Sequence, residues 1–275
     1  MIDPVIDVAE LRERERRAGT LRLIDIRWAL DGSKGETTYR TGHLPGAVYM
    51  DLETALAAPA TASTGRHPLP DPERFAWALG EAGIDPETTV VAYDDTDGSQ
   101  ASRLVWMLRA LGQDAALLDG GLRAWTGPLH TGSVHVDTVS CPVRIWGSDV
   151  IADLDEVAAG VPVLLDARAP ERYRGEVEPI DARPGHIPGA RSAPTSSTTD
   201  ETGRFRSPEA LRAQFTALGA DPDGDVVVYC GSGVTATHDL LALERAGFRR
   251  ARLFPGSYSQ WSARDELPVT RGDQP

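Results

Sequence analysis

One of the two cysteines stands where the sequence can make its thiol reactive. Cys230 follows the apolar run Val226–Tyr229 and opens the segment Cys-Gly-Ser-Gly-Val-Thr-Ala, which leads into a predicted helix over 237–246. In this order of strand, loop and helix, backbone N–H groups and the positive end of the helix can stabilise a thiolate. A free thiol with a pKa of about 8.5 is mostly protonated at neutral pH, so a nucleophilic cysteine needs such help. We therefore predict that Cys230 is a nucleophile.

The residues after Cys230 fit a loop that binds a sulfur anion. Gly231 and Gly233 have no side chains to keep backbone N–H groups from turning inward. Ser232, two residues from the thiol, is close enough to relay a proton. The predicted substrate-binding positions of the loop are Gly231, Gly233, Val234 and Thr235.

The loop differs from that of phosphatases with a Cys-x5-Arg signature. Those enzymes need a guanidinium six positions after the cysteine to neutralise the transferred group. Ala236 occupies that position here. Phosphatase activity is therefore disfavoured.

The sequence repeats itself once, and one copy lacks the thiol. Asp94 ends the apolar run Val90–Tyr93 as Cys230 ends its own run. Asp94 and Cys230 are 136 positions apart, and so are Trp125 and Trp261. We infer that a silent copy precedes a catalytic copy. The other paired landmarks are Leu23–Arg27 with Leu164–Arg168, and Gly42–Ala47 with Gly185–Ala190.

Each copy alternates short apolar runs with amphipathic segments. Continuous, β-branched runs between helices indicate strands buried on both faces, as in a parallel sheet. We therefore predict an α/β protein with two tandem domains, each a central parallel sheet flanked by helices. The predicted helices are 72–82, 99–111, 208–218 and 237–246. The predicted boundaries are 1–127 for the silent domain, 128–148 for a linker and 149–275 for the catalytic domain.

Composition and charge limit the partners. The chain has 275 residues, of which 41% are hydrophobic and 25% charged, and its formal net charge is -13. This acidic balance, spread over both halves, argues against binding to nucleic acid or to anionic membranes. No segment approaches the roughly 20 apolar residues of a membrane span, and the first residues carry no export signal. We expect a cytoplasmic protein that needs no cofactor.

The cysteines and acidic residues give no disulfide or metal pattern. Cys141 and Cys230 lie in different halves, without neighbouring His or Cys at metal-ligand spacing. We interpret Cys141 as an incidental thiol, the alternative being a redox partner of Cys230. Asp94, Asp95 and Asp97 are not followed by further oxygen ligands at the spacing of a cation loop, so no metal site is predicted.

Several motifs together resemble the two-domain rhodanese family of sulfurtransferases. They are the Asp-x-Arg after the first strand of each copy, the Gly-His-[Leu/Ile]-Pro-Gly-Ala turn, and the lone cysteine loop of the second copy. The resemblance extends from about Leu23 to Trp261. The loop sequence is similar to that of the 3-mercaptopyruvate sulfurtransferase branch in particular. In that family the amino-terminal copy is silent and has Asp at the cysteine position, which fits Asp94.

The repeated turn contains the histidines His43 and His186. Because the motif occurs equally in the copy without a thiol, we interpret both histidines as structural. The same interpretation applies to Asp25, Arg27, Asp166 and Arg168.

Arginines of the loop over 172–184 are candidates for binding the donor. Arg172, four residues after Arg168, matches the first substrate arginine of the family. Arg183 is the candidate for the second, with Arg174 as the alternative.

The resemblance also implies a proton relay. It would consist of Ser232, His67 and an acidic residue that orients the imidazole. Glu53 aligns best with the family acid, and Asp51 is the alternative.

Charge favours 3-mercaptopyruvate as the sulfur donor. The resemblance implies basic side chains in the loop of thiosulfate-type enzymes, where this chain has the neutral Gly231 and Ser232. A cation about 4 Å from an anion contributes roughly 4 kcal/mol at an effective dielectric constant of about 20. Loss of these cations therefore disfavours the thiosulfate dianion, whereas a monoanionic 2-oxo acid needs less.

We predict a sulfurtransferase that works by double displacement. The Cys230 thiolate attacks the sulfur of 3-mercaptopyruvate, pyruvate leaves, and the persulfide passes to cyanide or to a thiol acceptor such as a small thiol or a thioredoxin-like protein. One alternative is a thiosulfate:cyanide sulfurtransferase on the same scaffold. Another is a low-turnover persulfide carrier that binds a partner protein.

Overall fold

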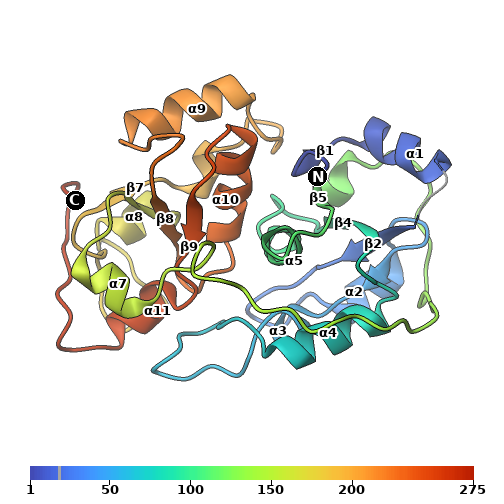
Figure 1. Ribbon diagram of the computed structural model, residues 1–275, viewed down its shortest axis with the longest axis horizontal. Coiled ribbons are helices and arrows are strands. Elements are labelled where there is room, and N and C mark those ends of the chain that lie inside the picture. Colours follow the sequence, from blue (N-terminus) through green and yellow to red (C-terminus); the bar gives the residue numbers. More distant parts are fainter. Residues whose placement is uncertain (18–19) are drawn as a thin grey trace. The chain divides into compact units, whose positions relative to one another are not determined.

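The computed structural model describes residues 1–17 and 20–275 and contains two compact α/β units (Figure 1). The first unit comprises Met1–Ala58, Pro70–Trp146 and Thr202–Arg204. The second comprises Pro59–Leu69, Gly147–Glu201 and Phe205–Pro275. The units therefore do not follow the chain strictly, because Pro59–Leu69 interrupts the first repeat and yet belongs by its contacts to the second unit.

The first unit holds a five-stranded parallel sheet in the order β1-β5-β4-β2-β3. Its central strand contains the apolar run that ends before Asp94, and the last four residues of the strand are buried. The strands are β1 (Val5–Ile6), β2 (Leu21–Asp25), β3 (Val48–Tyr49), β4 (Thr89–Tyr93) and β5 (Ala115–Leu118). The helices are α1 (Val8–Arg16), α2 (Glu36–Thr41), α3 (Leu52–Ala55), α4 (Pro72–Glu81), α5 (Ala101–Ala110) and α6 (Gly121–Ala124).

The second unit repeats this plan with a four-stranded parallel sheet in the order β7-β6-β8-β9. A single parallel bridge between Ile151 and Leu253 stands where β1 pairs with β5 in the first unit. The strands are β6 (Leu164–Asp166), β7 (Ala190–Ser192), β8 (Val226–Tyr229) and β9 (Ala251–Leu253). The helices are α7 (Leu154–Ala159), α8 (Pro170–Tyr173), α9 (Pro208–Ala217), α10 (Ala236–Arg245) and α11 (Ser257–Ser262), with a 3₁₀ turn η1 (Thr195–Ser197).

The predicted α/β class with parallel sheets and flanking helices is confirmed. The predicted helices lie within two residues of those observed. The largest difference is in the helix predicted to begin at Ser99, which begins at Ala101. The backbone N–H groups of Gln100 and Ala101 both donate to the Asp94 carboxylate, so this side chain fixes the start of the helix.

Residues 125–147, all of which the structure describes, form neither helix nor strand. A backbone bridge from His130 to His43 holds this segment to the first unit. Among the described residues, no helix has both the length and the apolar character needed to cross a bilayer.

Candidate active site

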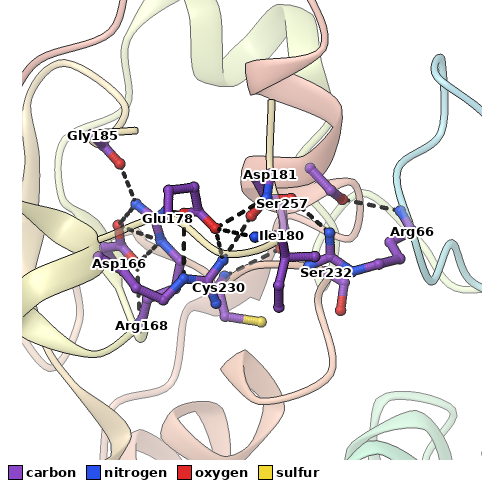
Figure 2. Close-up of polar contacts among 12 residues, drawn as sticks. Arg66, Asp166, Arg168, Glu178, Ile180, Asp181, Gly185, Cys230, Ser232 and Ser257 are labelled. Carbon is purple, nitrogen blue, oxygen red and sulfur yellow. Dashed lines mark hydrogen bonds and ion pairs between the residues drawn. The ribbon is translucent and has the colours of Figure 1, made fainter. Parts of the chain in front are cut away.

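Cys230 lies at the carboxyl end of β8, where it opens the loop that leads to α10 (Figure 2). Ligands of open parallel sheets bind at this edge, outside the carboxyl ends of the strands. The thiol is 2% exposed, and its Sγ accepts a hydrogen bond from the backbone N–H of Gly233 at 3.2 Å. Gly233 has φ 77, and a Cβ there would lie 2.5 Å from the carbonyl oxygen of Pro255. The glycine is therefore required for the N–H to reach the sulfur.

The start of α11 holds the cysteine loop in place. The backbone N–H groups of Tyr258 and Ser259 donate to the carbonyl oxygens of Cys230 and Gly231, at 3.0 and 2.9 Å. These bonds fix the backbone of the loop at its first two residues. The loop is thus anchored by residues that lie 28 positions further along the chain.

Ser257 links this anchor to the cysteine. Its Oγ accepts from the backbone N–H of Cys230 at 3.2 Å and donates to the carbonyl of Phe254 at 2.9 Å. Among the described residues, Ser257 is the sole non-glycine with positive φ, at 53°. A left-handed conformation costs an ordinary residue roughly 1–2 kcal/mol. The strained serine thus stands at the position from which its hydroxyl oxygen accepts the backbone N–H of Cys230.

The segment Pro59–Leu69 brings a histidine to the loop. Nδ1 of His67 lies 2.7 Å from Oγ of Ser232, and both residues are buried. The segment is docked on the start of α11, because the backbone N–H of Arg66 donates to Ser259 Oγ at 3.0 Å. Gly65 packs so closely there that a Cβ would lie 2.5 Å from the carbonyl oxygen of Gly256.

The acidic candidates for the relay lie in the first unit. Asp51 is the N-cap of α3, where its Oδ1 accepts from the backbone N–H of Thr54 at 2.9 Å. Its Oδ2 accepts from the hydroxyl of Tyr49 at 3.1 Å. Both oxygens of the Asp51 carboxylate thus accept hydrogen bonds from nearby residues of the same unit. Glu53 lies in the first turn of α3, and its role as the supporting acid stays a prediction.

Two guanidiniums converge above Gly231. A Cβ on this glycine would lie 2.9 Å from Nη2 of Arg66 and 3.4 Å from Nη1 of Arg172. The two arginines share one carboxylate, since Arg66 Nη1 donates to Asp181 Oδ1 at 2.6 Å and Arg172 Nη2 donates to Asp181 Oδ2 at 2.8 Å. Arg172 also pairs with Glu178 Oε1 at 2.7 Å. Arg172 thus lies at the cysteine loop, and its role in binding the donor stays a prediction.

Arg183 is placed differently from the expectation that it binds the donor. Its guanidinium donates to four backbone carbonyl oxygens at 2.6 to 3.2 Å, and all four belong to α11 and the residues after it. This arrangement commits Arg183 to holding the carboxyl-terminal segment. Arg174, the alternative, pairs with the exposed Glu176 at 2.8 and 2.9 Å. The carbonyl acceptors of Arg183 are Trp261, Ser262, Arg264 and Leu267.

A buried ion pair supports the edge of the second sheet. Nε and Nη2 of Arg168 both donate to the carboxylate of Asp166 at the end of β6, which also accepts from the hydroxyl of Tyr229 at 2.7 Å. Arg168 also lies 3.8 Å from the ring centroid of Tyr258 and 3.3 Å from Glu178. Burial alone would lower the pKa of Arg168, but the charge of Asp166 and its hydrogen bonds raise it. The Arg168 guanidinium therefore stays charged.

Both repeats match the model of the rhodanese-like domain, over residues 7–128 and 151–264. The chain belongs to the rhodanese family. SseB of Mycobacterium tuberculosis, provisionally named a thiosulfate sulfurtransferase, is 41% identical over 276 residues, which cover 98% of this chain and 97% of SseB. A Pseudomonas aeruginosa protein provisionally named a 3-mercaptopyruvate sulfurtransferase is 43% identical over 265 residues, covering 92% and 93% of the two chains.

The rhodanese fold also appears in the comparison with solved structures. The crystal structure of SseA from Escherichia coli, described as a 3-mercaptopyruvate sulfurtransferase with this fold, matches with a TM-score of 0.79 and 30% identity. The match covers 94% of this chain and 99% of SseA. The predicted membership of the two-domain family is therefore confirmed.

The first rhodanese copy has a carboxylate at the position that corresponds to the thiol. Asp94, at the end of β4, is fully buried, and both of its carboxylate oxygens accept backbone N–H groups at 2.8 to 3.1 Å. Burial raises the pKa of Asp94, and these donors oppose the rise. This loop thus surrounds a carboxylate with amides where the second copy has a thiol. The four donors are Thr96, Gly98, Gln100 and Ala101.

The two rhodanese copies also share their turn histidines. Nδ1 of His43 lies 3.0 Å from the carbonyl of Tyr39, and Nδ1 of His186 lies 2.8 Å from the carbonyl of Tyr173. Each imidazole stacks on the ring of the same tyrosine. Matching contacts in both copies support the structural interpretation of these histidines.

Sequence reasoning missed three residues of the rhodanese site. Arg66, Asp181 and Ser257 carry no motif of their own, and their importance comes from contacts between distant parts of the chain. One signal was present for Ser257. The repeat pairs Ser257 with Gly121, 136 positions earlier. In the structure Gly121 has the same φ of 53°, and the backbone N–H of its neighbour Leu122 donates to the carbonyl of Asp94 at 2.8 Å.

Proposed function

We propose that this chain is a sulfurtransferase that carries sulfane sulfur on Cys230. The Cys230 thiolate would attack the sulfur of 3-mercaptopyruvate and form an S–S bond, while the C–S bond of the donor breaks. The carbanion so formed takes up a proton and leaves as pyruvate. The sulfur remains on Cys230 as a persulfide, whose outer sulfur then passes to an acceptor.

The observation that carries this proposal is the pairing of an activated thiol position with a proton path. Gly233 donates its N–H to the sulfur, and Ser232, two residues from Cys230, lies within hydrogen-bond distance of His67. A leaving carbanion requires a proton donor close to the reacting sulfur. His67 and Ser232 supply such groups, with Glu53 as the proposed supporting acid.

The balance of charge around the loop supports 3-mercaptopyruvate as the donor. Arg66 and Arg172 approach Gly231, but Asp181 and Glu178 are paired with them at hydrogen-bond distance. A neutralised pair of guanidiniums can orient one carboxylate by directed hydrogen bonds without presenting the excess charge that favours a dianion.

Thiosulfate is the second candidate donor. Two guanidiniums within reach of one loop residue are also able to bind a dianion, and the SseB relative is provisionally named a thiosulfate sulfurtransferase. Steady-state rates with the two donors distinguish these possibilities. Faster turnover with thiosulfate would contradict the choice of 3-mercaptopyruvate.

The acceptor belongs to the same proposal. A thiol, either a small one or that of a thioredoxin-like protein, would attack the outer sulfur of the persulfide and regenerate the Cys230 thiolate. Cyanide would accept the sulfur in the same way and yield thiocyanate. We place this exchange in the cytoplasm, where thiol acceptors are kept reduced.

Mass spectrometry after addition of the donor tests the proposal. We expect the protein to gain the mass of one sulfur on Cys230, and Cys230→Ser to gain none. Cys141→Ser, which removes the other cysteine, should gain sulfur as the parent does. A protein that gains sulfur on Cys141, or on neither cysteine, would overturn it.

A further inference from the structure

We propose that Arg66 is the second donor-binding arginine and forms, with Arg172, a clamp for the carboxylate of the sulfur donor. This inference rests on the proposed function and names the residues that bind its substrate. Arg66 comes from the segment Pro59–Leu69, which also carries His67. One short segment would therefore supply both a cation for binding and an imidazole for proton transfer.

The two guanidiniums converge on the residue that follows the nucleophile. Nη2 of Arg66 and Nη1 of Arg172 lie 2.9 and 3.4 Å from the position that a Cβ of Gly231 would occupy. Gly231 follows Cys230 directly in the chain, so both guanidiniums lie at the loop that carries the nucleophile. Because Gly231 has no side chain, Nη2 of Arg66 and Nη1 of Arg172 can come this close to the loop, and the bonds to Asp181 and Glu178 use other nitrogens of the two arginines. Two planar guanidiniums that converge on one point match the two oxygens of a carboxylate.

Asp181 links the two arginines of the clamp. Its two carboxylate oxygens accept from different arginines, Oδ1 from Arg66 at 2.6 Å and Oδ2 from Arg172 at 2.8 Å. The Asp181 side chain is 1% exposed, whereas those of Arg66 and Arg172 are 23% and 18% exposed. The anion is thus buried and the cations reach toward solvent. Each guanidinium has five N–H donors, so the bond of Arg66 to Asp181 and the bonds of Arg172 to Asp181 and Glu178 do not exhaust them.

Glu178 fixes the turn that carries Asp181. Its Oε1 accepts the backbone N–H groups of Ile180 and Asp181 at 3.1 and 3.0 Å, as well as Arg172 Nη2 at 2.7 Å. A turn fixed in this way keeps the Asp181 carboxylate between the two arginines. The clamp is therefore built before any donor arrives, which lowers the entropic cost of binding.

Alkylation of Cys230 by a charged and a neutral reagent tests Arg66 without turnover. In a Cys141→Ser background, iodoacetate reports the attraction of a carboxylate to the site, and iodoacetamide reports the reactivity of the thiolate alone. We expect Arg66→Gln, which keeps a hydrogen-bond donor for Asp181 but no charge, to lower the iodoacetate-to-iodoacetamide rate ratio about tenfold. Arg66→Lys should keep most of the ratio.

Arg249→Ala is the matched control, because this exposed arginine pairs with Asp223 on the surface of the same unit. Its ratio should equal that of the parent. An unchanged ratio in Arg66→Gln would overturn the clamp. Because the ratio divides out thiolate reactivity, a change in the reactivity of the thiol alone would not move it.

Sulfuration kinetics then test the donor. In Arg66→Gln we expect the KM for 3-mercaptopyruvate to rise about 10- to 100-fold, with a smaller change in kcat. A lowered alkylation ratio with an unchanged KM would overturn the assignment to the donor. If the parent itself gains no sulfur from either donor, the proposed function fails, and the alkylation ratio still decides whether Arg66 binds a carboxylate.

Discussion

The imidazole of His67 lies 2.7 Å from the hydroxyl of Ser232, although 165 positions separate the two residues in the chain. The contact joins a loop of the first repeat to the cysteine loop of the second. Ser232 is two residues from Cys230 in the chain, so this contact brings an imidazole to the hydroxyl that we propose as the relay of a proton to the leaving carbanion.

Replacement of His67 by Ala should slow the first half-reaction about 100-fold, because general acid–base groups commonly contribute at least that factor. Release of pyruvate in a single turnover measures this step directly. His135→Ala, at an exposed histidine of the segment after the first unit's sheet, is the control and should react as the parent does. An equal rate in His67→Ala would remove this residue from the mechanism.

Ser257→Gly and Ser257→Ala should separate strain from function. Glycine accepts the φ of 53°, as Gly121 does in the first copy. The free energy of unfolding of Ser257→Gly should therefore lie within about 1 kcal/mol of that of the parent. Both variants lose the oxygen that accepts from the Cys230 N–H, and both should form the persulfide more slowly. Ser257→Ala should also be less stable than Ser257→Gly, because it keeps the strain. Thermal unfolding and single-turnover rates measure the two effects, and equal rates in all three proteins would contradict a role in positioning the thiol.

The two loop glycines should differ in their response to a methyl group. Gly231→Ala places a Cβ against the flexible ends of Arg66 and Arg172, so we expect a KM about tenfold higher and a folded protein. Gly233→Ala places its Cβ 2.5 Å from a backbone oxygen of Pro255 at φ 77, which the loop cannot accommodate without moving the Gly233 N–H. This variant should lose sulfuration at any donor concentration. Donor titrations of persulfide formation distinguish the two cases, and identical behaviour would count against the geometry of the loop.

Glu178 should make stability depend on pH in the acid range. Burial alone would raise the pKa of Glu178, but the hydrogen bond from Arg172 and the N–H of Asp181 lower it below the ordinary 4.5. A lowered pKa contributes stability that is complete above the ordinary value and is lost as the pH falls through the folded value.

Accordingly, Glu178→Gln should be destabilised by about 3 kcal/mol near neutral pH, and the difference from the parent should shrink as the solution is acidified below the ordinary pKa. Thermal unfolding across this range provides the measurement. Glu176→Gln is the control, since its exposed pair with Arg174 contributes little. A difference that is constant with pH would contradict the assigned role of Glu178.

Arg183→Ala should loosen the carboxyl-terminal segment rather than the donor site. The four carbonyl oxygens that hold its guanidinium belong to residues 261–267, so limited proteolysis should cut after α11 more readily in the variant. The KM for the donor should change less than in Arg66→Gln. A larger effect of Arg183→Ala on KM would instead restore Arg183 as a donor-binding residue.

Sequence patterns predicted those features of the fold and the site that depend on residues close together in the chain. The strand before Cys230, its loop and the following helix occupy neighbouring positions, and the repeat identified Asp94 as the counterpart of the thiol. The neighbourhood of Gly231 could not be predicted from the residues alone. Arg66 meets Asp181 across 115 positions, and Arg183 meets its carbonyl acceptors across 78 to 84 positions. Nothing in the type or spacing of these arginines tells which one folds back toward the cysteine loop.

Because of the segment Pro59–Leu69, the second repeat alone does not encode the whole second unit. The segment is encoded within the first repeat, yet by its contacts it belongs to the second unit, to which it brings His67 and Arg66. A gene shortened to the second repeat would encode a thiol without its imidazole and with one arginine where two converge. The first repeat has Asp94 where the second has its thiol, and yet it encodes two side chains of the second unit's site.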